Sequence, residues 1–164
     1  MAKQPGNGKD QSQDVSKQFQ IQKIYLKDVS LETPNTPHVF QQTWQPDVTI
    51  QLGNSAQVLS EDVHEVITTV TVTAKLADKT AFLVEVQQAG IFSISGYSAE
   101  ERGMLLGSYC PTVLFPYARE AVSDLVVKAG FPQLLLAPVN FEALYAQHLE
   151  NMKTKQPESS DAAH

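Results

Sequence analysis

The sequence predicts an α+β fold in which a four-stranded antiparallel sheet is followed by two main C-terminal helices packed on one of its faces. Between about residues 19 and 94, apolar and polar residues alternate with the period of a strand, in four segments separated by turns. After Ser98, apolar residues recur every three or four positions, which is the spacing of a helix. Because strands and helices come in two successive blocks, parallel βαβ units are not expected.

Composition limits both the size of the fold and the class of function. A chain of 164 residues has room for one domain with one sizeable core. We expect residues 18–152 to form this domain, between a disordered arm (1–17) and a mobile tail (153–164). The formal net charge is −6, from 12 basic and 18 acidic residues. This balance is unfavourable for binding nucleic acid or an anionic membrane surface.

The lack of a recognisable targeting signal and the single cysteine predict a soluble cytoplasmic protein. The N-terminal residues lack the apolar segment of a signal peptide, and no apolar run approaches the about 18 residues of a membrane span. The one cysteine, Cys110, cannot form an internal disulfide or a cysteine-based metal cluster.

The first strand is expected from Phe19 to Glu32. Strict alternation divides its side chains between two faces. The odd set is Phe19, Ile21, Tyr25, Val29 and Leu31, and the even set is Ile24, Leu26, Asp28, Ser30 and Glu32. Three prolines in residues 33–46 then exclude a helix or a central strand. A short second strand is expected over residues 47–52, followed by a polar connection over 55–62.

Residues 64–94 predict a hairpin that turns at residues 77–79. One face of its two strands is apolar, and comprises Val66, Val70, Val72, Ala74, Leu76, Phe82, Val84, Val86, Phe92 and Ile94. The other face of the second strand carries Leu83, Glu85 and Gln87, which form a partly apolar and partly acidic surface.

The helical half begins at Ser98, which has capping-box spacing to Glu101 and predicts a short helix over about residues 99–107. A longer helix is expected to begin near Thr112 or near Phe115, because Pro116 belongs in a first turn, and to end at Gly130. A last helix over residues 141–152 is expected to begin after Asn140, a good N-cap residue.

Residues with catalytic chemistry do not form a pattern. The histidines lack the spacing of metal ligands, and the scattered glycines match no phosphate-binding loop. Cys110 has two interpretations, a reactive thiol or, more commonly, a buried small apolar side chain. We therefore expect no enzyme activity, no metal and no cofactor.

Apolar residues suggest a binding groove. Phe40 and Trp44 of the proline-rich loop, with one face of residues 47–52 and the last helix, could line it. The commoner interpretation is that these side chains close the core.

Several segments, taken together, resemble the SecB protein-export chaperones. They are FQIQKIYLKDVSLETPNTPHVFQQTWQPDV, VTVTAKL, AFLVEVQQAGIFSI, LLGSYCPTVLFPYAREAVSDLV and FPQLLLAPVNFEALY, and they span roughly residues 19–150 in one order. The resemblance implies an ATP-independent chaperone that is not an enzyme and assembles as a tetramer, a dimer of dimers. It would hold unfolded precursor proteins and deliver them to the SecA ATPase.

The resemblance also assigns residues to three contacts. The client groove would comprise Val39, Phe40, Trp44, Val48, Ile50, Leu52, Phe141, Leu144 and Tyr145. The SecA-docking residues would be Asp28, Glu32, Leu83 and Glu85, and the tetramer contacts would be Val84, Val86 and Gln88. Alternation agrees that Asp28 and Glu32 share one face, as do Leu83 and Glu85, and leaves open whether the two pairs lie on the same side. An alternative for the same fold is a binder of one small apolar ligand or of one dedicated partner, such as an antitoxin.

Overall fold

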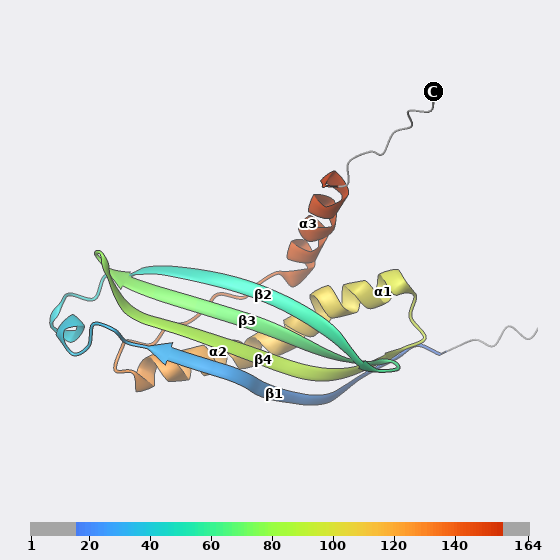
Figure 1. The fold of residues 1–164 in the computed structure, drawn as a ribbon, viewed down its shortest axis with the longest axis horizontal. Coiled ribbons are helices and arrows are strands. Elements are labelled where there is room, and N and C mark those ends of the chain that lie inside the picture. The colour runs from blue at the N-terminus through green and yellow to red at the C-terminus, as the bar shows by residue number, and fades with distance from the viewer. Residues whose placement is uncertain (1–15, 156–164) are drawn as a thin grey trace, which may run out of the picture.

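The computed structural model describes residues 16–155 and contains one four-stranded antiparallel sheet followed by helices (Figure 1). The strands are β1 (Gln18–Glu32), β2 (Asp47–Ser60), β3 (Val63–Leu76) and β4 (Lys79–Ser95), and they lie side by side in the order β1-β4-β3-β2. The helical segments are η1 (His38–Gln41), α1 (Ala99–Met104), η2 (Leu105–Tyr109), α2 (Cys110–Lys128) and α3 (Phe141–Thr154). The predicted α+β class and antiparallel sheet are confirmed.

The main core lies between the sheet and α2. In the β3–β4 hairpin, Val70 lies opposite Val86 and Val72 opposite Val84, and all four side chains are fully buried. They belong to one apolar cluster with residues of α2 such as Val122. The predicted apolar face of the hairpin is therefore confirmed as the face that α2 covers. We call the opposite side of the sheet the open face.

Strand β2 is longer than the sequence indicated. It was expected to end at Leu52, but it pairs with β3 as far as Ser60. Gly53 lies opposite Thr69, and an added Cβ there would meet only the Thr69 Cβ, at 3.8 Å, so the strand passes through this glycine without crowding. The missed half is exposed throughout, including Val58 and Leu59, and has no alternating apolar face, because backbone hydrogen bonds can hold an edge strand without one.

Two bulges in β1 overturn strict alternation along that strand. Its pairing with β4 slips at Gln22 and again at Lys27. Each extra residue exchanges the faces of the residues that follow it. Between the bulges, Ile24 and Leu26 therefore lie opposite β4 residues of the α2-covered face, and Tyr25 turns to the open face. Tyr25 and Ile24 thus exchange the faces that the sequence assigned to them.

The helices α1, η2 and α2 follow one another without a break, and α2 begins at Cys110, close to the predicted start near Thr112. Pro116 was expected in a first turn, but it lies inside the helix. Pro111 lies in the first turn of α2, and the π-helical segment η2 immediately precedes it. A wider turn accommodates a proline ring that lacks an N–H group, which explains why Pro111 does not end the helix.

No helix within residues 16–155 is long and apolar enough to span a membrane.

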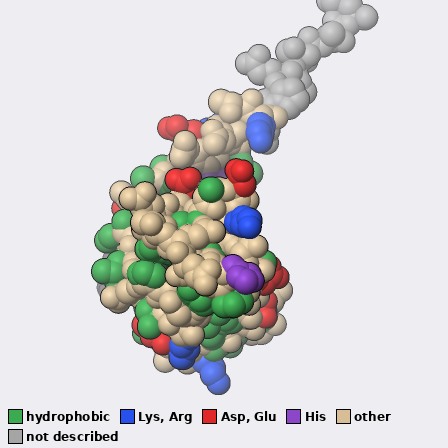
Figure 2. Space-filling view, turned by 90° about the vertical axis from the view of Figure 1, so that its left-hand side faces the viewer, with side chains coloured by type: hydrophobic (Ala, Val, Ile, Leu, Met, Phe, Trp, Pro, Cys, Tyr) green, Lys and Arg blue, Asp and Glu red, His purple; other side chains and the backbone are tan. Residues whose placement is uncertain are grey.

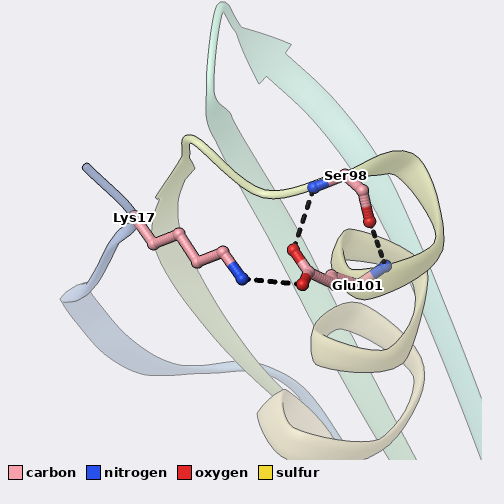
Figure 3. A network of polar contacts seen from close by, with 3 residues as sticks. All are labelled: Lys17, Ser98 and Glu101. Carbon is pink, nitrogen blue, oxygen red and sulfur yellow. Dashed lines mark hydrogen bonds and ion pairs between the residues drawn. The ribbon is translucent and has the colours of Figure 1, made fainter. Parts of the chain in front are cut away.

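The start of α1 has the predicted capping box (Figure 3). The Ser98 hydroxyl accepts from the Glu101 N–H at 3.2 Å, and the Glu101 carboxylate accepts from the Ser98 N–H at 3.0 Å. The same carboxylate pairs with the Lys17 ammonium at 2.7 Å, which ties the start of the described chain to α1. Two other predicted helix boundaries are also confirmed: α2 ends just before Gly130, which has a positive φ, and α3 begins after the N-cap residue Asn140.

Helix α3 differs from its predicted position. It was expected to pack on the sheet beside the longer helix, but it contacts mainly η2 and projects away from the sheet (Figure 1). It begins at Phe141 and runs to Thr154, so Lys153 belongs to the helix and not to the predicted tail. Most of the predicted arm and tail lies outside the described residues.

Candidate functional site

The four predicted docking residues lie on the same side of the sheet. Glu32 pairs opposite Leu83 across β1 and β4, and Asp28 pairs opposite Gln87, the next residue but one after Glu85. Residues directly opposite each other in a sheet point to the same face. Because Leu83 and Glu85 alternate with the buried valines of β4, this shared side is the open face. The structure thus answers the question that alternation left open.

The carboxylates on the open face around Glu85 are not paired with basic side chains in the described part of the chain. Asp28 and Glu32 are exposed, and Leu83 and Glu85 are half-buried. Thr71 of β3 donates to the Glu85 carboxylate at 2.9 Å, which fixes that side chain without neutralising it. Of the three ion pairs found within residues 16–155, none involves these three carboxylates. We call Asp28, Glu32, Leu83 and Glu85 the acidic row.

Another carboxylate on the open face is buried, and sequence reasoning missed it. Glu65 of β3 accepts hydrogen bonds from Lys27 at 2.8 Å, from Gln57 at 2.8 Å, and from the Tyr25 hydroxyl. Its side chain is only 7% exposed. Hydrogen bonds from Lys27 and Tyr25 lower the pKa of Glu65, and burial, with the bond to Glu65, raises the pKa of Tyr25 to about 12. The available signal was that Glu65 is the one acidic residue of β3.

The predicted groove residues differ widely in exposure. Val39 and Phe141 are buried, so the core interpretation holds for these two. Trp44, Leu52 and Tyr145 are half-buried. The remaining side chains are exposed, at 49% for Phe40, 39% for Val48, 47% for Ile50 and 44% for Leu144.

One group of these residues surrounds the proline-rich loop. Trp44 stacks on Phe82 with ring centroids 6.3 Å apart and contacts Phe131 at 5.3 Å, and Phe40 lies 5.1 Å from Phe131. These contacts hold the loop against the end of the core. Val48 and Ile50 lie nearby in sequence on the α2-covered face of the edge strand β2, where they remain exposed. Figure 2 views the molecule from one end and shows apolar side chains in several separate groups.

A second group lies under α3. A groove of about 300 Å³ is lined by residues of α3, β2 and the α1–η2 segment. Its lining residues are Asn54, Ser55, Ala56, Gly103, Leu106, Gly107, Tyr145, His148, Leu149 and Met152. Of the predicted groove residues only Tyr145 lines it, so the structure places that set around two separate surfaces and not in one pocket.

Tyr145 holds α3 by packing into a notch between two glycines. A Cβ on Gly107 would lie 2.5 Å from the Tyr145 ring, and one on Gly103 would lie 2.9 Å from its hydroxyl. Both distances are shorter than carbon atoms tolerate. In the sequence, these glycines matched no phosphate-binding loop and gave no sign of a packing role.

We predict that Gly107→Ala loosens α3, because the added methyl group displaces the Tyr145 ring. Local destabilisation of about 1–3 kcal/mol is expected. Amide hydrogen exchange in α3 should rise correspondingly, while exchange in the β3–β4 core stays unchanged. Gly53→Ala is the matched control, because its Cβ would meet only an ordinary contact at 3.8 Å. Unchanged protection of α3 in Gly107→Ala would contradict the role of the notch.

The predicted tetramer-contact residues are inside the protomer. Val84 and Val86 are fully buried beneath α2, and Gln88 is 5% exposed and donates to the Tyr25 carbonyl at 3.0 Å. The chain's own core already surrounds these side chains, and their contact with another protomer stays a prediction. An effect on assembly through the packing of α2 stays a prediction.

Neither a metal site nor a reactive thiol is found within residues 16–155. Cys110 is buried, and desolvation raises its pKa to about 12, so its thiol is protonated at neutral pH. Within residues 16–155 no group of three or more His, Cys, Asp or Glu side chains could hold a metal ion.

Comparison with known proteins identifies the family. The family model described as "Preprotein translocase subunit SecB" matches residues 12–152. A protein-export protein SecB of Nitrosococcus oceani is 58% identical over 156 residues, covering 94% of this chain and 95% of that protein. The one of Methylococcus capsulatus is 59% identical over 141 residues, covering 86% and 91%.

A solved structure shares the fold. It is a SecB-like chaperone of Mycobacterium tuberculosis in complex with a peptide from an antitoxin, with a TM-score of 0.62 and 18% identity, covering 74% of this chain and 90% of that one. The family match and the two relatives show that this chain belongs to the SecB protein-export family.

Proposed function

We propose that this protein is an ATP-independent chaperone of protein export, which holds unfolded precursor proteins and delivers them to the SecA ATPase. The observation that carries the proposal is membership of the SecB family over nearly the whole chain. The separation of exposed apolar groups from the acidic row, on different surfaces of one protomer, supports two kinds of contact. The chain would work in the cytoplasm, where precursors are made.

Client binding would use the apolar groups near the loop and under α3. Burial of apolar surface stabilises a complex by about 25 cal/mol per Å² and has no directional requirement. Several shallow apolar contacts therefore give affinity without demanding one sequence. Folded proteins bury the segments that would fill such surfaces, so binding selects clients that fold slowly.

Assembly as a dimer of dimers is part of the proposal. Strand β1 is at the edge of the sheet, so one side of its backbone has no partner strand within residues 16–155. Large side chains of α2 and the segment before it, including Tyr109, Tyr117 and Val127, are about half-exposed. Both features support contacts between copies. A tetramer would concentrate four acidic rows and favour encounter with a basic surface of SecA.

A comparison of unfolded and folded forms of one precursor tests the chaperone role. We expect the unfolded form to bind with a Kd of about 1 µM or tighter, and the folded form not to bind measurably. Light scattering would report the mass of the complex and of the chaperone alone. Ile50→Thr should weaken binding, whereas Thr49→Ser, on the other face of β2, should not. Equal binding to both forms of the precursor would refute the proposal, and a response to one ligand only would favour a dedicated partner.

A further inference from the structure

Glu65 is buried on the face of the sheet that no helix covers. The side chains that enclose it come from other strands, Tyr25 and Lys27 from β1 and Gln57 from β2. Strand β4 lies between β1 and β3, so the two β1 side chains reach across it to Glu65. Ala89 of β4 lies opposite Tyr25, and its small side chain leaves room for that crossing. This network joins three strands through one carboxylate.

Lys27, one of the donors to Glu65, is also the extra residue of the second β1 bulge. Pairing with β4 passes from Leu26 directly to Asp28, so Lys27 has no partner of its own in the register. A bulge fixes the faces of the residues on either side of it, and the loss of one residue from the register exchanges them. The position of Asp28, which follows Lys27 directly, therefore depends on the bulge being maintained.

We propose that Glu65 is a positioning residue for partner docking, because it holds the Lys27 bulge and thereby keeps Asp28 and Glu32 in line with Leu83 and Glu85 on the open face. The inference rests on the proposed function, in which the acidic row binds SecA. Glu65 itself is covered by its donors and does not contact the partner. Its effect passes through the register of β1.

The proposal assigns Glu65 an effect that a purely stabilising residue would not have. Substitution of Glu65 should change docking only while the acidic row is present. Once Asp28 and Glu32 have been replaced by neutral residues, the loss of the bulge no longer displaces a β1 carboxylate of the acidic row. Coupling of this kind between two sites is measured by a double-mutant cycle.

The test measures SecA affinity and client affinity of full-length Glu65→Gln, alone and combined with Asp28→Asn and Glu32→Gln. We expect Glu65→Gln alone to weaken SecA docking by about fivefold or more, with client affinity unchanged within about twofold. No further loss is expected in the combined variant. Hydrogen exchange of the β1 amides should rise near Lys27. Glu100→Gln makes the same charge change at an exposed position of α1 and should leave docking unchanged.

Lys27→Met provides a second variant if Glu65→Gln fails to fold, because Tyr25 and Gln57 then still bind the carboxylate. It should give the same selective loss of docking. Unchanged docking in these variants, or an equal loss with and without the acidic row, would overturn the inference. The charge reversal Asp28→Lys with Glu85→Lys separates this failure from failure of the proposed function. If that reversal leaves docking intact, the acidic row is not the docking surface and both proposals fail.

Discussion

Phe82→Ala should lower the free energy of unfolding by about 3–5 kcal/mol, the largest loss of stability that we expect from a single truncation in this chain. The ring is 1% exposed, so its removal takes away buried apolar surface and leaves a cavity. The neighbours cannot easily fill that space, because Trp44 stacks on one part of the ring and Phe131 lies against it with ring centroids 5.1 Å apart. Both neighbours also hold the proline-rich loop in place.

Chemical denaturation followed by circular dichroism measures this loss, at a fixed protein concentration because assembly contributes to stability. Phe40→Ala is the matched control, since it removes the same ring from the same aromatic group at a position that is 49% exposed. Its expected loss is about 1 kcal/mol. Similar losses for the two variants would show that the group is not organised around Phe82.

Core residues such as Phe82 were predictable because burial imposes a pattern on the sequence. The β3–β4 hairpin has one face against α2, so alternation was enough to identify it. Edge strands are under no such constraint. The second half of β2 is exposed and lacks an alternating apolar face, so its backbone pairing leaves no trace in the choice of side chains. The β1 bulges were hidden for another reason, since each one inserts a single residue and alternation resumes after it with the faces exchanged.

The candidate surfaces were predictable to different degrees. Alternation paired Leu83 with Glu85, but only the register between β1 and β4 could place Asp28 on the same side. The apolar residues near Phe40 and those of α3 looked like one groove because nothing in a sequence fixes the direction of a helix after a linker. The notch that receives Tyr145 depends on two glycines whose missing side chains have no pattern of their own.

Simultaneous Asp28→Lys and Glu85→Lys should weaken SecA docking by about a hundredfold or more, and client affinity should stay within about twofold. Both carboxylates lie on the open face without an ion-pair partner in the described structure, so their field is directed outward. Reversal replaces two attractions to a basic partner by two repulsions. Both substitutions lie away from the core, because Asp28 is exposed and the half-buried Glu85 accepts from Thr71 on the open face. Folding should therefore be preserved.

The control must separate a local surface from total charge, because the chain is acidic throughout, with a net charge of −6. Glu61→Lys with Glu100→Lys changes the net charge by the same amount at exposed positions away from the acidic row. Isothermal titration at low and moderate salt measures docking for both variants. Raised salt should weaken wild-type docking and narrow its difference from the reversed variant, because ions screen exposed charges. If both variants lose affinity equally, attraction comes from net charge, and the alignment of the acidic row has no special part in docking.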